Sequence, residues 1–158
     1  MRKVLVTGMS GTGKSTVLAE LARRGFEVVE TDDAPWSEWS EADGGYVWRE
    51  DLVEELLSRD DDGTLYVSGT VSNQGSFYPR FDAVVLLSAP VDVLLRRLDA
   101  RTTNDYGKTA EERALILSHV AEIEPLLRAT CTREIDATQP LDDVVAQLIE
   151  IARSIATR

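Results

Sequence analysis

Residues 8–15 read GMSGTGKS, which fits the pattern G-x-x-x-x-G-K-[ST]. The preceding residues Lys3–Thr7 (KVLVT) are typical of a buried strand, and Ser15–Arg24 carries apolar side chains at helical spacing. Glycines at such a turn let the backbone curl, so that several N–H groups and a helix N-terminus point at one anion. The stretch therefore predicts a phosphate-binding loop between a strand and a helix.

Each part of this loop has an expected role in holding a nucleoside triphosphate. The Lys14 ammonium can reach the β- and γ-phosphate oxygens, and the Ser15 hydroxyl can ligate Mg²⁺, which prefers oxygen ligands. The loop thus predicts binding of ATP or GTP together with Mg²⁺. The predicted nucleotide-binding residues here are Gly8, Met9, Ser10, Gly11, Thr12, Gly13, Lys14, Ser15 and Thr16.

Short apolar runs alternate with helical patterns along the rest of the chain. The predicted strands are Lys3–Thr7, Phe26–Glu30, Leu65–Ser68, Ala83–Leu87 and Cys131–Asp136. The predicted helices are Ser15–Arg24, Arg49–Arg59, Pro90–Leu98, one that begins at Thr109, and Leu141–Ile155. This alternation predicts an α/β fold, in which about five parallel strands carry helices on both faces. No repeat or linker interrupts the pattern, so residues 1–158 are expected to form a single domain.

Local signals mark the ends of two of these helices. Gly25 predicts the C-cap of the first helix, because glycine readily takes the left-handed conformation that ends a helix. Thr109 and Glu112, three residues apart, predict a capping box at the start of a later helix. Pro125 lacks an N–H group, so we expect it to end or kink that helix.

The composition and net charge of the chain exclude several classes of binding partner and several kinds of site. The chain has 28 acidic and 17 basic residues, a net charge of −11, so nucleic acid and anionic membranes are not expected partners. One cysteine and one histidine argue against disulfides, a zinc cluster or a Ser-His nucleophile. No apolar run approaches the ~18 residues needed to span a bilayer. We therefore expect a soluble protein of a reducing, cytoplasmic compartment, and we expect it to be a monomer or homodimer.

Two other classes of nucleotide-binding protein lack support in the sequence. A GTPase switch would need an Asn-Lys-x-Asp motif, which is missing. A motor-type ATPase would place an acidic residue at the end of the third strand for Mg²⁺, where this chain has Ser68-Gly69-Thr70. A GTPase switch and a motor-type ATPase are therefore disfavoured.

The order of these parts resembles the small P-loop kinases of the adenylate kinase, shikimate kinase and gluconate kinase type, within the P-loop NTPase superfamily. The resemblance covers essentially the whole chain in layout, and GMSGTGKS is its most specific motif. It implies a three-layer P-loop NTPase fold with a short lid at about residues 101–109. It also implies an acceptor-binding arm at about residues 32–62, and a loop after the last strand, residues 136–140, that packs against adenine.

The resemblance further implies catalytic roles. In that family an acidic residue after the second strand handles the acceptor hydroxyl, and this position falls on Asp32 or Asp33. Adjacent side chains on an extended chain point opposite ways, so we expect only one of the two to face the acceptor, and we favour Asp32. A turn or helix N-cap is the alternative for the pair. Arg97 would stack on adenine and Arg101 would contact the phosphates, unless both lie on a solvated helix face. Lys14 completes the predicted catalytic set.

The arm also indicates what the acceptor is. Residues 20–62 carry 15 acidic and 4 basic side chains, whereas the remainder of the chain is neutral. A phosphorylated acceptor is therefore disfavoured. Trp36, Trp39, Tyr46 and Trp48 in the arm indicate a planar, sugar-like or cationic acceptor, or else the small core of a flap. The predicted acceptor-binding residues are Trp36, Trp48, Arg49, Ser68, Gly69, Thr70, Asn73, Gln74 and Arg80.

Three functions fit these observations. The first is an ATP- and Mg²⁺-dependent kinase that phosphorylates a hydroxyl on a small, non-phosphorylated acceptor, such as a nucleoside, sugar acid or natural product. The second is a nucleoside monophosphate kinase, which would need Arg49 and Arg80 to grip the acceptor phosphate. The third is a regulatory nucleotide-binding module without phosphoryl transfer, in which Asp32 and Asp33 are structural.

Overall fold

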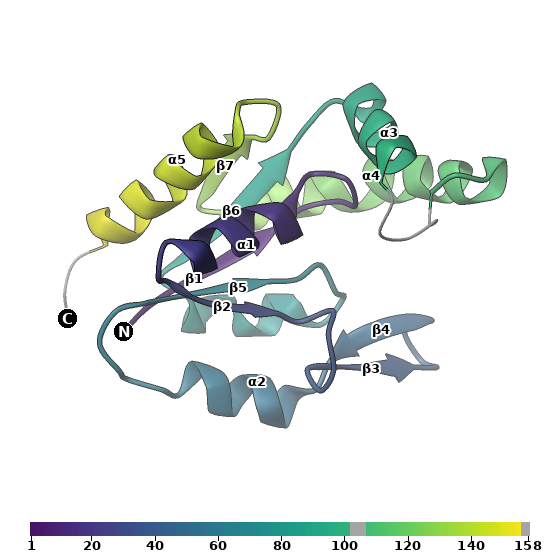
Figure 1. The fold of residues 1–158 in the computed structure, drawn as a ribbon. Coiled ribbons are helices and arrows are strands. Elements are labelled where there is room, and N and C mark those ends of the chain that lie inside the picture. The colour runs from purple at the N-terminus through teal and green to yellow at the C-terminus, as the bar shows by residue number, and fades with distance from the viewer. Residues whose placement is uncertain (102–106, 156–158) are drawn as a thin grey trace.

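A five-stranded parallel sheet organises the chain in the computed structural model, which describes residues 1–101 and 107–155 (Figure 1). The strand order is β2-β5-β1-β6-β7, so the strand that leads into residues 8–15 lies at the centre. The strands are β1 (Arg2–Thr7), β2 (Glu27–Glu30), β5 (Thr64–Ser68), β6 (Ala83–Ser88) and β7 (Arg133–Asp136). In the register of the sheet, Val4 pairs with Tyr66 of β5 and Ala83 of β6. The predicted α/β fold with a five-stranded parallel sheet is confirmed.

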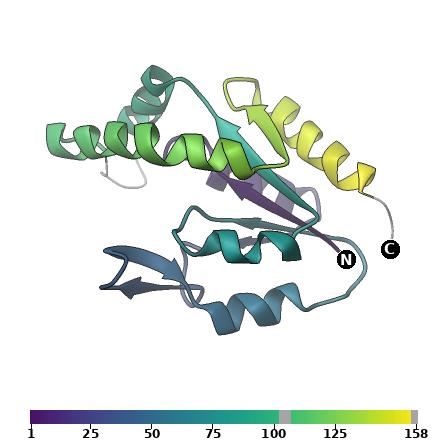
Figure 2. The same ribbon diagram turned by 180° about the vertical axis from the view of Figure 1, so that it is seen from behind.

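Helices cover both faces of the sheet (Figures 1 and 2). One face carries α1 (Lys14–Arg23) and α5 (Leu141–Ser154), and the other carries α2 (Glu50–Leu57), the 3-10 helix η1 (Gln74–Arg80) and α4 (Ala110–Thr130). The remaining helix, α3 (Val91–Ala100), packs through Leu94 against Met9 and Leu86. The result is the predicted three-layer arrangement.

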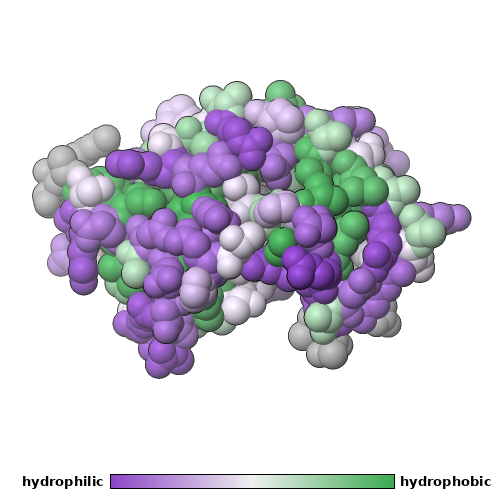
Figure 3. All heavy atoms as spheres, turned by 90° about the horizontal axis from the view of Figure 1, so that it is seen from above, coloured by the Kyte–Doolittle hydropathy of each residue, from purple (hydrophilic) through white to green (hydrophobic). Residues whose placement is uncertain are grey.

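The alternation of side chains along each strand builds one apolar core on each face of the sheet. Val4 and Val6 of β1 point toward α1 and α5, whereas Leu5 points toward α2, and all three are fully buried. Strands that are covered on both faces have continuous apolar sequences. The positions of the strands in this sheet could therefore be predicted from the sequence. Outside the cores, hydrophilic residues surround smaller hydrophobic areas on the face in Figure 3.

The structure confirms two of the three predicted helix ends. Gly25 has φ +95°, and its N–H and that of Phe26 donate to the carbonyls of Ala22 and Leu21, both at 3.0 Å. This is the hydrogen-bond pattern of a Schellman motif. Thr109 and Glu112 form the expected capping box at the start of α4.

Of the two outcomes expected at Pro125, an end of the helix is wrong, because α4 runs on to Thr130, and a kink stays a prediction. The missing N–H costs one backbone hydrogen bond within the helix. Contacts on the far side of the proline offset that loss: Leu127 is buried against α3 and β6, and Arg128 forms an ion pair with Glu124 at 2.9 Å.

A two-stranded antiparallel hairpin, β3 (Ser37–Ser40) and β4 (Gly45–Trp48), follows β2 and was not predicted. It projects from the sheet on the side where the strands have their carboxyl ends (Figure 1). Within the predicted lid, residues 102–106 lie outside the described residues. None of the described helices is long and apolar enough to cross a membrane.

Candidate active site

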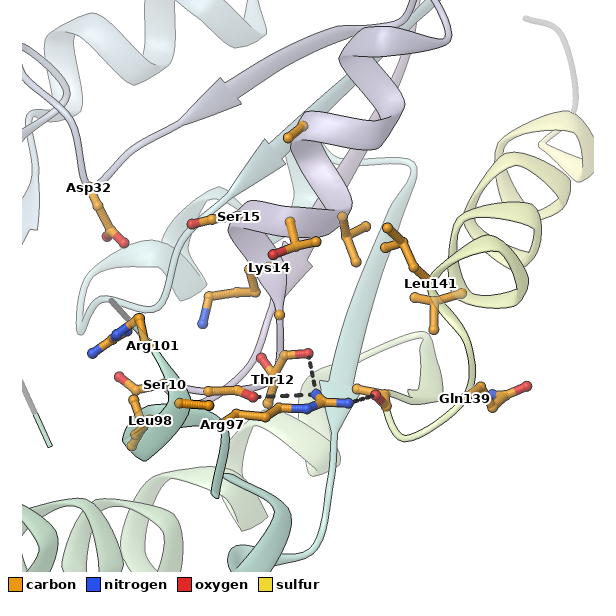
Figure 4. A pocket seen from close by; sticks show the side chains of 18 residues that line it. Ser10, Thr12, Lys14, Ser15, Asp32, Arg97, Leu98, Arg101, Gln139 and Leu141 are labelled. Carbon is orange, nitrogen blue, oxygen red and sulfur yellow. Dashed lines mark hydrogen bonds between the residues drawn. The ribbon is translucent and has the colours of Figure 1, made fainter. Parts of the chain in front are cut away.

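A pocket of about 910 Å³ lies at the carboxyl end of the central strand (Figure 4). In parallel α/β sheets this is the end at which ligands bind. Four segments meet there: the loop after β1 with the first turns of α1, the end of β2, the end of α3, and the connection from β7 to α5. The lining residues are Ser10, Gly11, Thr12, Gly13, Lys14, Ser15, Thr16, Val17, Ala19, Asp32, Arg97, Leu98, Ala100, Arg101, Ala137, Gln139, Leu141 and Val144.

Residues 8–13 form the predicted loop, which is held by its own hydrogen bonds and by α3. The backbone N–H and the hydroxyl of Thr12 both donate to the carbonyl of Met9, at 3.3 and 2.9 Å. Gly11 has φ +90°, and a Cβ atom there would lie 2.9 Å from the carbonyl oxygen of Leu94. Both features require glycine, so the close approach of α3 depends on residue 11 having no side chain.

The Lys14 side chain folds back onto this loop. Its Nζ donates to the carbonyl of Gly8 and, at 3.2 Å, to that of Met9. Burial lowers the pKa of the Lys14 ammonium to about 8, although the nearby negative charge of Asp32 opposes that shift. The Lys14 ammonium is thus poorly solvated and donates hydrogen bonds to two carbonyl groups. Phosphate oxygens can take the place of these carbonyls as acceptors.

This lowered pKa predicts that nucleotide binding weakens in mildly alkaline solution. Below pH 8 Lys14 carries the charge that phosphate attracts, and bound phosphate raises its pKa further, so binding takes up a proton once the pH exceeds 8. We expect log Kd for ATP to rise with pH above 8, with a slope approaching about 1 per pH unit. Isothermal titration calorimetry between pH 6.5 and 9.5 measures this slope. Lys14→Arg, which stays charged, is the control, and an equal slope in that variant contradicts the assignment.

Only one of the two adjacent aspartates lines the pocket. Asp32 is among the lining residues and Asp33 is not, and the charge of Asp32 acts on Lys14. In Figure 4 the Asp32 carboxyl group, the Ser15 hydroxyl and the Lys14 ammonium face the same space, with Arg101 at its edge. The structure therefore brings together Lys14, Asp32 and Arg101, three of the predicted catalytic residues.

Arg97 lies in the pocket in a role that sequence reasoning missed. Its guanidinium donates to the carbonyls of Gly11 and Thr12 at 3.3 and 3.2 Å, and to that of Ala137 at 2.5 Å. It thus joins the loop after β1 to the loop after β7, and the predicted loop at 136–140 contributes Ala137 and Gln139 to the lining. Stacking of Arg97 on adenine stays a prediction.

A second hydrogen-bond network ties the loop to residues 70–74, which follow strand β5. The Thr70 hydroxyl donates to the carbonyl of Gly8 at 2.6 Å, which is the same carbonyl that accepts from Lys14. Gln74, which is 2% exposed, donates to Thr7 at 3.1 Å and accepts from the N–H of Val71 at 2.9 Å. Thr70 and Gln74 therefore help to position the phosphate-binding loop, although neither of them lines the pocket.

Comparisons with known proteins agree with this geometry. Residues 4–118 match a family model described as an AAA domain. The chain is 27% identical to shikimate kinase 2 of Yersinia enterocolitica, over 94% of each protein. It is 30% identical to a candidate adenylate kinase of Archaeoglobus fulgidus, over 95% of this chain and 82% of that one. This chain belongs to the P-loop kinase family. Phosphoryl transfer is therefore its class of activity.

A solved structure shows the same fold. A gluconokinase from Sinorhizobium meliloti superposes with a TM-score of 0.68 at 24% identity, covering 98% of this chain and 93% of that one. The similarity covers nearly the whole length of both chains and shows that this P-loop kinase and the gluconokinase share one fold.

All nine predicted acceptor residues of this P-loop kinase lie outside the pocket. Trp48 is 1% exposed, and its indole N–H donates to Thr31 at 2.7 Å. The Asn73 side chain accepts from the N–H of Trp48 at 2.9 Å and donates to its carbonyl at 3.0 Å. A Cβ on Gly69 would lie 2.8 Å from the Trp48 ring. These residues anchor the hairpin to the sheet.

The remaining predicted residues are also engaged within the protein. Ser68 accepts from Thr31 through its carbonyl, and Trp36 packs against the apolar core beside α2. Arg49 pairs with Asp51 at 3.7 Å, and Arg80 pairs with Glu54. Contact of these residues with an acceptor thus has no support from the geometry. Leu98, Ala100, Leu141 and Val144 line the pocket although no signal in the sequence separated them from other core positions.

Proposed function

We propose that this protein is an ATP- and Mg²⁺-dependent kinase that phosphorylates a hydroxyl group of a small acceptor that carries no phosphate. The observation that carries the proposal is the position of Asp32 in the same pocket as Lys14 and residues 10–16. Phosphoryl transfer depends on positioning and on neutralising the charge of the transferred group, with a carboxylate beside the incoming hydroxyl. A carboxylate, Asp32, and positively charged groups such as Lys14 and Arg101 line one pocket, which supports the proposal.

In the proposed reaction the acceptor oxygen forms a bond to the γ-phosphorus, and the bond from that phosphorus to the β–γ bridging oxygen breaks, releasing ADP. Asp32 accepts the proton of the attacking hydroxyl. Lys14 leaves the carbonyls of Gly8 and Met9 to bind the β- and γ-phosphate oxygens. Arg101, at the C-cap of α3, lies at the edge of the pocket and would meet the transferred phosphoryl group.

The residues of the pocket fit a magnesium ion bound together with the nucleotide. The Ser15 hydroxyl is exposed and lines the pocket, and it is an oxygen ligand of the kind Mg²⁺ takes. Among residues 1–101 and 107–155, no group of three or more acidic, His or Cys side chains forms an all-protein metal site. Mg²⁺ usually keeps several waters and binds through substrate phosphates, so Ser15 would hold it, and the ion would supply further neutralisation of phosphate charge.

The positions of Arg49 and Arg80 favour an acceptor without a phosphate over a nucleoside monophosphate. A monophosphate kinase would need both guanidinium groups at the acceptor phosphate. Instead, each pairs with a carboxylate of α2, and neither lines the pocket. The positive charge that lines the pocket belongs to Lys14, Arg97 and Arg101, and the proposal assigns Lys14 and Arg101 to the triphosphate.

A coupled assay of ADP release tests the proposal over a panel of nucleosides, nucleoside monophosphates, sugar acids and aminoglycosides. We expect turnover that rises at least tenfold over basal hydrolysis with one non-phosphorylated class, and no stimulation in the Lys14→Ala variant, which controls for contaminating ATPases. Stimulation by monophosphates alone contradicts the proposal in favour of a monophosphate kinase. Tight ATP binding without stimulation by any acceptor favours a regulatory module.

A further inference from the structure

The hairpin β3–β4 presents two aromatic rings to solvent at its outer end. Trp39 and Tyr46 face each other across the strands, with ring centroids 5.4 Å apart and ring planes at 84°. Trp39 is 54% exposed and Tyr46 is 64% exposed. Within residues 1–101 and 107–155 they are the exposed aromatic side chains, whereas Trp36, Trp48 and the other rings are at least partly buried. The stability of the core does not account for such a pair.

The inner end of the same hairpin face is fixed to the sheet. Side chains alternate along a strand, so Trp48 lies on the same face as Tyr46 and Trp39. Trp48 is buried, and its indole N–H donates a hydrogen bond to the Thr31 hydroxyl at 2.7 Å. The side-chain oxygen and nitrogen of Asn73 both form hydrogen bonds with the backbone of Trp48. The exposed rings therefore stand on an anchored strand pair, and a ligand would not have to order them, which lowers the cost of binding.

The charge around the two rings is negative. The Glu41 carboxylate accepts from the indole N–H of Trp39 at 3.0 Å, so it lies at the edge of that ring. Residues 32–48 include five acidic side chains and no basic one. The two rings meet edge to face at nearly a right angle, so their exposed π surfaces lie side by side, and the adjacent Glu41 carboxylate adds a counter-charge. This combination attracts a cation and repels an anion.

We propose that the aromatic corner formed by Trp39, Tyr46 and Glu41 binds a positively charged group of the acceptor, an ammonium or guanidinium. The inference rests on the proposed kinase function, which it extends by giving the acceptor a charge. The hairpin projects on the side where β2 ends and the chain continues through Asp32 into β3 (Figure 1). The corner and the carboxylate that receives the hydroxyl proton thus belong to one continuous segment.

A titration that does not depend on catalysis tests the cation site. The probes are choline and its uncharged isostere 3,3-dimethylbutan-1-ol, followed through the three tryptophan indole signals in ¹⁵N–¹H spectra. We expect choline to shift the Trp39 signal and to bind about tenfold more tightly than the neutral probe. The Trp36 and Trp48 signals serve as internal controls. Equal binding of the two probes, or no shift at Trp39, overturns the proposal.

Two variants connect the site to the acceptor. Trp39→Leu and Glu41→Gln change exposed residues, and far-UV circular dichroism checks that each variant is folded. For cationic acceptors we expect the acceptor KM to rise about tenfold in Trp39→Leu and less in Glu41→Gln, with kcat and the KM for ATP unchanged. For neutral acceptors we expect no change.

The two arms separate failure of this inference from failure of the proposed function. If no acceptor is turned over by the unmodified protein, the kinase function has failed, while the choline titration still decides whether the corner binds a cation. If choline shifts Trp39 but Trp39→Leu leaves the KM of every acceptor unchanged, the corner serves another partner, and the assignment to the acceptor is overturned.

Discussion

The Lys14→Ala variant is expected to lose the thermal stabilisation that ATP gives the unmodified protein. At 100 times its Kd, a ligand that binds only the native state stabilises it by about 2.7 kcal/mol, which for a chain of this size raises Tm by roughly 5 to 10 °C. Without the Lys14 ammonium, nothing in the loop replaces the charge that meets the β- and γ-phosphates. We therefore expect a shift below about 1 °C in the variant, and a loss of about 10³-fold or more in turnover.

Differential scanning fluorimetry with and without ATP measures this effect, and far-UV circular dichroism checks that the fold is intact. Lys3→Ala is a matched control, because Lys3 lies at the other end of β1, where its Nζ donates to the carbonyl of Leu57 at 2.6 Å. That variant should keep the full ATP-dependent shift. An unchanged shift in Lys14→Ala would show that the phosphates bind elsewhere.

The part of the site that follows β1 could be predicted from the sequence because local constraints define it. A buried strand, three glycines and a helix start leave the backbone few alternatives, and Gly11 is required both by its φ and by the close approach of Leu94. The roles proposed for Lys14 and Ser15 rest on their spacing within that motif. Local patterns of this kind also located each strand of the five-stranded sheet.

The acceptor side could not be predicted in the same way, because it depends on contacts between distant segments. Trp48 and Asn73 are 25 residues apart, and the Asn73 side chain forms two hydrogen bonds with the backbone N–H and carbonyl of Trp48. An indole or amide that completes the fold has the same sequence signature as one that contacts a ligand. Only the burial of Trp48 and the exposure of Trp39 separate the two roles, and exposure is set by tertiary packing.

The Asp32→Asn variant is expected to lose turnover by about 10²-fold or more while it keeps its affinity for ATP. A carboxylate that takes the hydroxyl proton typically contributes this much, and the amide cannot accept that proton. Because the negative charge of Asp32 also acts on the buried Lys14 ammonium, its removal lets the ammonium lose its proton more easily. That effect is offset by the smaller repulsion of the triphosphate, so the loss should appear in kcat rather than in the Kd for ATP.

Asp33→Asn provides the matched control, since it makes the same chemical change one residue away and outside the pocket. Its turnover should stay within about threefold of the unmodified protein, because an exposed carboxyl group removed from the reacting atoms contributes only weak, screened electrostatics. Steady-state kinetics with a fixed acceptor and calorimetry with ATP measure both quantities. If Asp33→Asn has the larger effect, the acceptor hydroxyl lies on the other side of the chain after β2. If neither amide slows transfer, the proton goes to a different group, and the acceptor site must be sought away from the end of β2.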